Sequence, residues 1–417
     1  MDDILELADR LWRGEMDITT SHPLAMAGGL TEVADKTAYV ASFARVSAFA
    51  TEDGLVLVDT GHELAAKSIH EQVRAWNPDR LDTAIFSHGH IDHVFGVGVF
   101  EEESAANRWK APSVVAHEAL PLRFDRYKMT AGYNAVINRR QFQVPGLEWP
   151  TEYRYPDRTY RDHLELEVGG ERFELHHAKG ETDDHTWTYV PARKVLCTGD
   201  LFIWCSPNAG NPQKVQRYPL EWARALREME ALGAELLLPG HGFPVAGAER
   251  VSQALSETAE YLESLVSQAL ELMNAGARLD DLIHNVQPPV HLADRPFLRP
   301  VYDEPEFIVR NLWRLYGGWY DGNPANLKPA PEAALAREVA ELAGGASRLA
   351  ARALELLAAG DERLAGHLAE MAVLAAPGDA GAHEARATVY AKRAEEATST
   401  MAKGVFAFTA SESRHHH

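Results

Sequence analysis

The sequence predicts an α/β protein in which a sandwich of two β-sheets is flanked by helices and followed by an all-helical, repeat-like region. Short apolar and β-branched runs fall into two groups, with helical patterns between them. After about residue 248 these strand patterns give way to long helical ones. A chain of 417 residues can form two or three domains. We therefore expect one domain at residues 1–248, a helical domain at 249–411 and a tail at 412–417 that ends in a tag remnant, His415–His417.

The first group of strands begins at Thr37. Between Thr37 and Asp59 alternating residues pass into an apolar run around a Glu-Asp-Gly turn, the pattern of a β-hairpin. Residues 62–76 then predict a helix with one apolar face. That face carries Ala65, Ile69, Val73 and Trp76. The segment LDTAIFS, residues 81–87, predicts a short buried strand.

Six further runs predict the later strands: PSVVA, LELEV, ERFELHH, WTYV, KVLCTG and AELLLPG. A helix is expected between the last two, at LEWARALREMEAL. The helical region begins with ERVSQALSETAEYLESLVSQALELMNAG, and the chain is rich in Ala and Leu from Pro331 onward. Gly360-Asp361 and Gly378-Asp379 lie eighteen residues apart and each provide a turn with an N-cap. Such an alternation is typical of helix-turn-helix modules that serve packing or association.

Composition argues against several classes of function. The formal charge of −20 repels nucleic acid and anionic membranes, so an anionic substrate would need a local positive centre. No apolar run approaches the roughly 20 residues of a membrane span. Cys197 and Cys205 are too few for a disulfide scaffold or a four-cysteine zinc site. We therefore expect a cytoplasmic protein with a small-molecule substrate and neither nucleic acid nor membrane as a partner.

A dense cluster of possible metal ligands follows the buried strand, in the segment SHGHIDH. His88 and His90 are two residues apart, so in an extended segment they point the same way, and Asp92 and His93 follow at the next turn. Imidazole and carboxylate groups suit borderline divalent metals such as zinc, and these four residues can surround two adjacent ions. The alternative is a polar turn in which the histidines are incidental.

The segment SHGHIDH resembles the H-x-H-x-D-H signature of the metallo-β-lactamase superfamily. Three further landmarks of that superfamily occur along the chain in the expected order, one before this segment and two after it. VLVDTG contains Asp59, TGD contains Asp200, and LPGHG contains His241. The resemblance implies an αββα sandwich with a binuclear metal site.

The same resemblance implies two Zn²⁺ ions per chain. The ligands it assigns are His88 and His90 to one metal, Asp92, His93 and His241 to the other, and Asp200 as the bridge between them. Asp59 would be structural, bonded near the ligand loop. Asp92 would also orient the nucleophilic water and take its proton.

The third superfamily motif typically reads H-T-P-G-H-T-P-G-H, with the middle histidine as a ligand. In HAKGETDDH the outer histidines match His177 and His185, and Glu181 falls at the ligand position, nineteen residues before Asp200. This glutamate resembles the alkylsulfatase branch, the type III sulfatases, in which it completes the shell of the first metal. A carboxylate there would lower the net positive charge of the site and weaken its Lewis acidity. The alternative has His177 or His185 as the ligand, with Glu181 behind it.

Two further segments resemble that branch. TAGYNAVINRRQF matches an Asn-rich segment that ends in paired arginines, here Arg139 and Arg140, and GGWYDGNPANLKP resembles the G-Y-Y-D-G-N-P signature that opens the alkylsulfatase dimerisation domain. The resemblance implies a homodimer formed through the C-terminal helical domain. Lys214 and Arg217 are the candidate cations for the substrate in NAGNPQKVQRYPLEW.

The resulting hypothesis is a binuclear zinc hydrolase that acts on alkyl sulfate esters or a related anionic ester. Asp92 would orient a metal-activated water, and Lys214, Arg217 or the arginine pair would stabilise the anionic leaving group. The branch commonly has Ala-Glu where this chain has Gly199-Asp200, so the resemblance carries the metal chemistry further than the sulfate specificity. The alternatives are hydrolysis of a lactone, thioester or phosphoester at the same site, an iron-dependent redox enzyme, and a non-catalytic assembly module.

Overall fold

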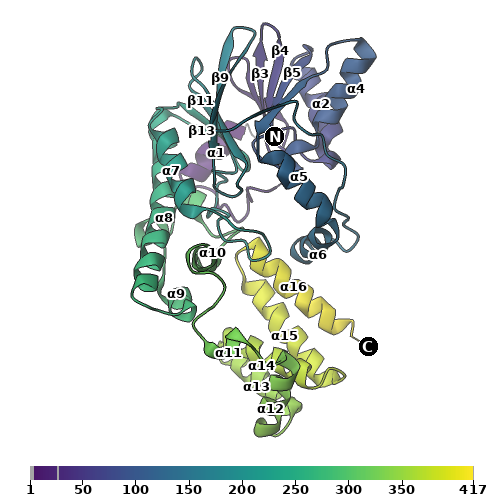
Figure 1. Ribbon diagram of the computed structural model, residues 1–417, viewed down its shortest axis with the longest axis vertical. Helices are drawn as coiled ribbons and strands as arrows, with labels where there is room; N and C mark the ends of the chain where they lie inside the picture. Colours follow the sequence, from purple (N-terminus) through teal and green to yellow (C-terminus); the bar gives the residue numbers. More distant parts are fainter. Residues whose placement is uncertain (1–3, 26–27, 417) are drawn as a thin grey trace. The chain divides into compact units, whose positions relative to one another are not determined.

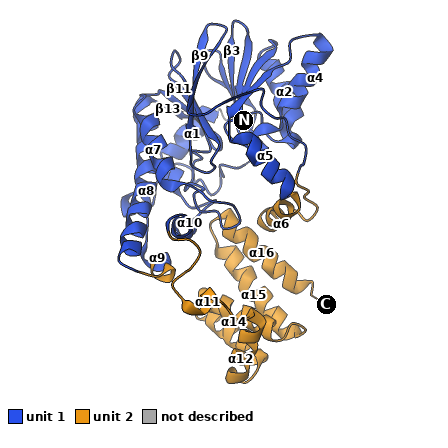
Figure 2. Cartoon of the chain, viewed as in Figure 1, with its two compact units in different colours: residues 1–130, 150–276, 282–316 blue, residues 131–149, 277–281, 317–417 orange. Residues whose placement is uncertain are grey.

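The computed structural model describes residues 4–25 and 28–416. The chain forms two compact units (Figure 2). Unit 1 comprises residues 1–130, 150–276 and 282–316, and unit 2 comprises residues 131–149, 277–281 and 317–417. This division differs from the boundary expected at residue 248, because α8 (Ala248–Asn274) packs against α7 (Pro219–Glu230) inside unit 1.

Two β-sheets form the centre of unit 1 (Figure 1). The seven-stranded sheet contains β1 (Leu30–Ala34), β2 (Thr37–Val40), β3 (Val46–Thr51), β4 (Gly54–Val58), β5 (Leu81–Ile85), β6 (Ser113–His117) and β7 (Arg158–Tyr160), in that order. β1 to β4 pair antiparallel, and β4 to β7 pair parallel. The β3–β4 pairing places Thr51 opposite Gly54, which confirms the predicted hairpin.

The six-stranded sheet has the order β13-β12-β11-β10-β9-β8. Its strands are β8 (His163–Val168), β9 (Glu171–Ala178), β10 (His185–Val190), β11 (Val195–Gly199), β12 (Leu236–Pro239) and β13 (Val245–Ala246). Within this second sheet, the β11–β12 pair alone is parallel among the strands that the structure describes. Because parallel neighbours end at the same edge of a sheet, the residues after β11 and β12 come together.

Helices flank both sheets in unit 1, with α2 and α4 on one side and α7 and α8 on the other (Figure 1). The helices that flank the sheets or connect their strands are α1 (Ile4–Trp12), α2 (Glu63–Trp76), α3 (Ile91–Val94), α4 (Val97–Asn107) and α5 (Leu120–Met129), besides α7 and α8. Ile69 and Val73 of α2 are buried in the core of the first sheet, as predicted. Burying an aliphatic side chain of this size contributes about 1.5–3 kcal/mol. The expected αββα sandwich is confirmed.

The segment after α8 contains α9 (Leu279–Asn285), two 3₁₀ turns at Val290–Leu292 and Pro296–Leu298, and α10 (Pro305–Gly317). Unit 2 is helical, as predicted. Its helices are α6 (Ala131–Phe142), α11 (Pro324–Leu327), α12 (Glu332–Ala343), α13 (Ala346–Ala358), α14 (Glu362–Ala375), α15 (Ala380–Glu396) and α16 (Thr400–Arg414).

Both predicted N-caps of unit 2 are present. Asp361 accepts a hydrogen bond from the backbone N–H of Leu364 at 3.2 Å, and Asp379 accepts one from Ala382 at 2.8 Å. Helix α16 continues to Arg414, so the first part of the expected tail at 412–417 is helical. Among the described helices, none is at once long and apolar enough to cross a bilayer.

Candidate metal centre

The predicted ligands gather where several strands of the two sheets end. His88, His90, Asp92 and His93 follow β5, Asp200 follows β11, His241 follows β12, and Glu181 lies in the loop between β9 and β10. The side chains of His88 and His93 are fully buried, whereas that of His90 is 17% exposed. The fold thus brings together residues that lie far apart in the chain.

The first group of ligand atoms comes from His88, His90, Glu181 and Asp200. His88 Nε2 and His90 Nδ1 lie 2.7 Å apart. Glu181 Oε2 lies 3.6 Å from the first of these nitrogen atoms and 3.5 Å from the second. Asp200 Oδ2 lies 3.8 Å from His88 Nε2. One atom from each of the four residues can therefore face a common point.

The second group comes from Asp92, His93 and His241. His241 Nε2 lies 3.3 Å from Asp92 Oδ2, and His93 Nε2 lies 3.5 Å from the same oxygen. Asp200 contacts this group as well, because its Oδ1 lies 3.4 Å from His93 Nε2 and its Oδ2 lies 3.4 Å from His241 Nε2. Asp200 therefore stands between the two groups and contacts both.

These donor atoms fit divalent cations. His93 Nε2, Glu181 Oε2 and Asp200 Oδ1 are buried and make no hydrogen bond within the described part of the chain. Buried polar atoms are nearly always partnered, so atoms of this kind are suited to bind a positive centre. The contacts of 2.7–3.8 Å also bracket the distance of about 3.4 Å between neighbouring ligands in a tetrahedron with bonds of about 2.1 Å.

Asp59 orients the ligand loop, as expected of it. Its Oδ1 accepts a hydrogen bond from the backbone N–H of Ser87 at 2.7 Å, and its Oδ2 accepts one from the Ser87 hydroxyl at 2.7 Å. The same Oδ2 lies 2.7 Å from His93 Nδ1, which turns Nε2 of that ring toward the other ligands. His241 is turned in the same way, because its Nδ1 lies 2.7 Å from the carbonyl oxygen of Phe43.

Carboxylates dominate the electrostatics of the centre. Burial, together with the charge of Asp200, raises the pKa of Glu181 to about 8. Burial alone would lower the pKa of His93 and of His241, but the Asp200 carboxylate raises both, that of His241 to about 9. Protons and cations therefore compete for the same nitrogen atoms.

The other histidines near Glu181 have different contacts. The ring of His177 stacks on His117 at 3.6 Å. His185 Nε2 lies 3.2 Å from the carbonyl oxygen of Thr198. Neither ring joins the two ligand groups found among the described residues. The geometry therefore favours Glu181 over either histidine at the third ligand position.

A buried ion pair that the sequence did not predict lies beneath the histidine loop. Arg123 Nε donates to Asp184 Oδ1 at 2.7 Å, and the other Asp184 oxygen accepts the backbone N–H of Gly89 at 2.9 Å. A Cβ atom at Gly89 would lie 2.8 Å from Arg123 Cδ, so a larger residue between His88 and His90 would have to displace the Arg123 side chain. Nothing in the local pattern around Arg123 signals that its guanidinium is buried.

The predicted substrate cations have different environments. Lys214 is partly buried, and burial together with the charge of Arg217 lowers its pKa to about 8. Arg217 is buried and donates to the backbone carbonyl of Glu181 and, at 3.3 Å, to Glu181 Oε1. Arg139 and Arg140 belong to α6 of unit 2, where the first donates to the carbonyl of Leu147 and the second lies over the Phe408 ring.

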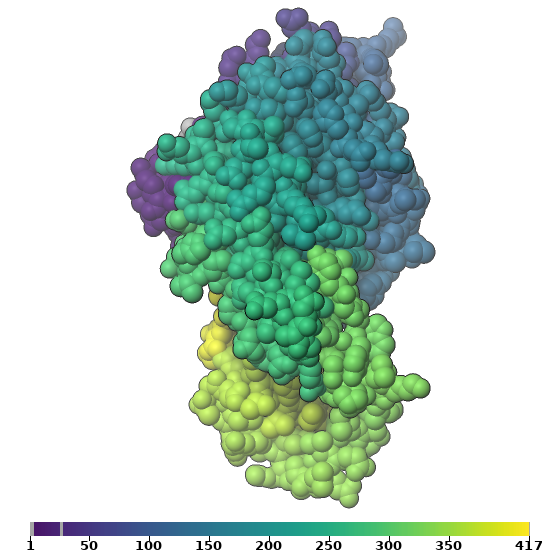
Figure 3. Space-filling view, turned by 60° about the vertical axis from the view of Figure 1, so that its left-hand side comes forward, coloured from purple at the N-terminus to yellow at the C-terminus, as the bar shows by residue number. Residues whose placement is uncertain are grey.

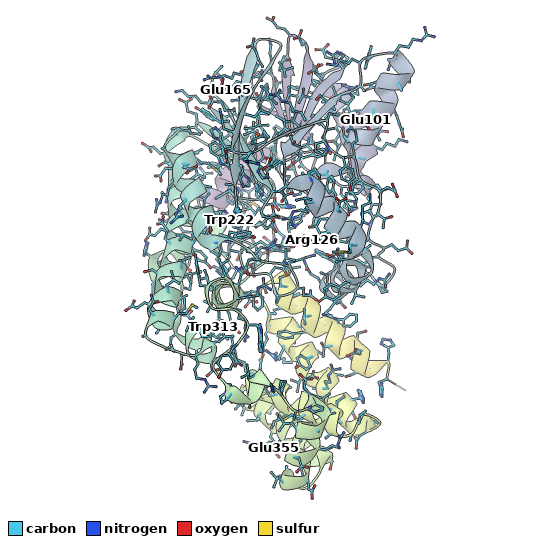
Figure 4. The ribbon with its side chains drawn as sticks, in the orientation of Figure 1. Glu101, Arg126, Glu165, Trp222, Trp313 and Glu355 are labelled. Carbon is cyan, nitrogen blue, oxygen red and sulfur yellow. The ribbon has the colours of Figure 1, made fainter. Side chains whose placement is uncertain are left out.

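Helix α7 closes one side of the Glu181 loop. Trp222, labelled in Figure 4, lies on α7 and donates from its indole nitrogen to the carbonyl oxygen of Leu201 at 2.8 Å. A Cβ atom at Gly180 would lie 2.4 Å from Leu201 Cδ2 and 3.2 Å from the Trp222 ring. The absence of a side chain at Gly180 therefore allows the loop to approach this helix closely.

Two family descriptions cover most of the chain. Residues 42–241 match the metallo-beta-lactamase superfamily, and residues 278–416 match the family described as alkyl sulfatase dimerisation. A linear primary-alkylsulfatase from a Pseudomonas strain is 28% identical over 338 residues, which cover 75% of this chain and 62% of the relative. An (R)-specific secondary-alkylsulfatase from Pseudomonas is 27% identical over 421 positions, and the match covers 63% of that relative. The chain thus spans less than two thirds of the length of these curated relatives.

A solved structure supports the assignment of the fold. The stereoselective inverting sec-alkylsulfatase Pisa1 from Pseudomonas superposes with a TM-score of 0.84 at 24% identity. The superposition covers 93% of this chain and 66% of the Pisa1 chain. The family matches confirm the predicted resemblance, and this likeness confirms the predicted fold. The chain therefore contains a metallo-beta-lactamase superfamily domain at residues 42–241 and an alkyl sulfatase dimerisation domain at residues 278–416.

Proposed function

We propose that this protein is a binuclear zinc hydrolase that cleaves alkyl sulfate esters or a closely related anionic ester. The observation that carries the proposal is the position of Asp200 between two groups of buried imidazole and carboxylate donors. His88, His90 and Glu181 would complete the site of one ion, and Asp92, His93 and His241 that of the other. These donor types suit Zn²⁺. The names of the two curated relatives described above, both alkylsulfatases, support the choice of substrate.

When bound, two zinc ions supply Lewis acidity and lower the pKa of water in the site. Asp92 would orient the attacking water by accepting a hydrogen bond from it, and would then take its proton. Burial works against ionisation of this carboxyl, yet the neighbouring His93 and His241 hold its pKa below the ordinary value. The Asp92 side chain is 16% exposed, so water can reach it. Lys214 supplies positive charge for an anionic ester against the overall charge of −20.

The protein forms a homodimer through unit 2 in this proposal. Large apolar side chains remain exposed on unit 2, whose helices form the yellow-green surface in Figure 3. They include Trp319, Leu327, Leu335, Leu342 and Leu354. Such side chains, when they lie close together, mark association surfaces. Light scattering at micromolar concentration should give twice the chain mass, and a monomer would contradict this part of the proposal.

The cell compartment is proposed from the cysteines. Cys197 and Cys205 are buried and form no disulfide. Burial raises the pKa of both thiols, which keeps them unreactive. Unbridged thiols of this kind suit a reducing compartment such as the cytoplasm.

Sulfate release measured over a panel of esters tests the substrate. Primary and secondary alkyl sulfates should release sulfate, whereas lactones, thioesters and phosphodiesters of matched chain length should turn over more slowly. A lactone that is hydrolysed while no sulfate ester reacts would reject the sulfatase assignment. In ¹⁸O-labelled water, label in the alcohol would show cleavage of the C–O bond, and label in the sulfate would show cleavage of the S–O bond.

Elemental analysis tests the metals independently of the substrate. About two zinc ions per chain are expected. A single iron ion would favour the redox alternative and contradict the hydrolase proposal.

A further inference from the structure

The two carboxylate oxygens of Glu181 have different surroundings. Oε1 accepts a hydrogen bond from the side-chain amide of Asn208 and one from Arg217 at 3.3 Å. Oε2 is buried, makes no hydrogen bond among the described residues, and faces His88 at 3.6 Å and His90 at 3.5 Å. Only Oε2 is therefore available to a cation shared with the two histidines.

We propose that Arg217 and Asn208 are positioning residues that occupy Glu181 Oε1 and so present Glu181 to the first metal through a single oxygen. This inference rests on the proposed binuclear site. It gives Arg217 a role different from the one expected from the sequence, where it was a candidate for stabilising the leaving group.

Arg217 holds both the backbone and the side chain of Glu181. One terminal nitrogen donates to the backbone carbonyl of Glu181 and the other to its Oε1. The side chain of Arg217 is 1% exposed, so both contacts are shielded from water. A hydrogen bond to a charged group is stronger in such a buried environment than in water.

Helix α10 holds Arg217 in place. The backbone N–H of Arg217 donates to Asn311 Oδ1 at 3.2 Å, and Asn311 Nδ2 donates to the backbone carbonyl of Arg217 at 3.1 Å. One buried asparagine therefore binds the Arg217 backbone from both sides, which limits the directions that the guanidinium can take.

The same helix supports the loop that carries Asn208. The backbone N–H of Gly210 donates to Asp303 Oδ2 at 2.6 Å, immediately before α10 begins. A Cβ atom at Gly210 would lie 2.1 Å from the backbone nitrogen of Ile308, so the loop lies directly against the helix backbone. Both positioning residues are therefore fixed to one rigid element.

A glutamate needs such support more than a histidine does. Its side chain has more rotatable bonds than that of histidine, so more freedom must be removed to hold one oxygen in place. It also adds a negative charge to a site that already contains Asp92 and Asp200, and the guanidinium of Arg217 offsets that charge in the buried centre. Glu181 and Arg217 thus act as a pair at the position where the superfamily motif has a neutral histidine.

Zinc binding by the full-length chain tests the proposal without reference to turnover. Apoprotein is titrated with zinc against a chromophoric chelator for the wild type, Arg217→Met and Asn208→Leu. Each variant should bind one of its two zinc ions about 10-fold or more weakly and the other normally. Arg217→Lys should restore part of the affinity. Arg227→Met is the matched control, because Arg227 pairs with Glu263 on the outer helices, and it should bind zinc as the wild type does.

A double-mutant cycle separates positioning from general damage. If Arg217 acts through Glu181, the double variant Glu181→Gln, Arg217→Met should lose no more zinc affinity than Glu181→Gln alone. The absorption spectrum of the cobalt-loaded protein should change in the same way in Arg217→Met and Glu181→Gln, since both alter one coordination shell.

Two results would overturn the proposal. The first is wild-type affinity for both zinc ions in both Arg217→Met and Asn208→Leu. The second is a raised KM for a sulfate ester with unchanged zinc affinity in Arg217→Met, which would assign Arg217 to the substrate. A wild type that binds fewer than two zinc ions would instead reject the proposed function, so the two failures are distinguishable.

Discussion

Replacing Gly199 by alanine should destabilise the protein through a steric contact at the metal centre. Gly199 ends β11, precedes Asp200 and has a φ of +50°. A Cβ atom at this position would lie 2.6 Å from His185 Nε2 and 2.7 Å from Ser87 Cβ. Both neighbours support His88, because the His185 ring stacks on it at 4.6 Å and the Ser87 hydroxyl lies 2.9 Å from its Nδ1.

The size of the effect follows from two contributions. Holding alanine in the left-handed region costs about 1 kcal/mol relative to glycine. Forcing a methyl group into a packed core costs about 1–3 kcal/mol more. Gly199→Ala should therefore lower the free energy of unfolding by about 2–4 kcal/mol. Gly233 is the matched control, because it has a φ of +64° but nothing within 4 Å of its Cβ position, so Gly233→Ala should cost only about 1 kcal/mol.

Urea unfolding of the two zinc-free variants measures this difference. The steric contribution is the loss in Gly199→Ala minus the loss in Gly233→Ala, about 1–3 kcal/mol. Equal losses in the two variants would refute the reasoning. A larger loss in Gly199→Ala would show that the neighbours of residue 199 in this chain leave no room for a Cβ atom.

Three further predictions concern the charges of the centre. Asp59→Asn keeps the shape of the side chain but removes the charge that orients His93. Zinc affinity in a chelator titration should therefore fall by about 10-fold. An affinity equal to that of the wild type would contradict the structural role of Asp59. Because burial lowers the pKa of Lys214 to about 8, KM for a sulfate ester should rise above that pH, whereas Lys214→Arg, which stays charged, should show no such step. In zinc-free protein, burial lowers the pKa of His241, but the nearby carboxylates outweigh burial and raise that pKa from 6.5 to about 9. The bound proton therefore stabilises the fold fully below pH 6.5, and this stabilisation is lost as the pH rises through 9. Burial of Glu181, with a pKa of about 8, acts in the same direction. The loss in free energy of unfolding attributable to His241 is roughly 3 kcal/mol. Calorimetry should show a melting temperature that falls between pH 6.5 and about pH 9.5 without zinc and stays nearly constant with zinc. A melting temperature that does not change with pH in the zinc-free protein would contradict this.

The ligand types could be predicted because they are local in the chain. His88 and His90 leave a buried strand two residues apart, and Asp92 and His93 follow at the next turn, so neighbouring backbone alone directs them to one region. The strands were predictable for a similar reason, since alternation and apolar runs report directly on pairing and burial. The position of Glu181 followed from its place in a motif, and the structure brings its Oε2 to the two histidines.

The division into units could not be read from these patterns. α6 lies early in the chain yet belongs to unit 2, where it packs on α16, and α8 belongs to unit 1. A helical pattern reports that one face is apolar and does not report which other helix will cover it. The boundary expected at residue 248 followed a change of pattern, whereas the compact units follow packing.

The buried charges show the same limit most clearly. Local sequence was enough to specify which residues could bind metal, because residue type and spacing set the chemistry and direction of each side chain. Packing alone determined that Arg217 holds Glu181, 36 residues away, and that Arg123 holds Asp184. An arginine has the same local pattern whether it faces water or a buried carboxylate, and only the folded chain excludes the water that would otherwise solvate it.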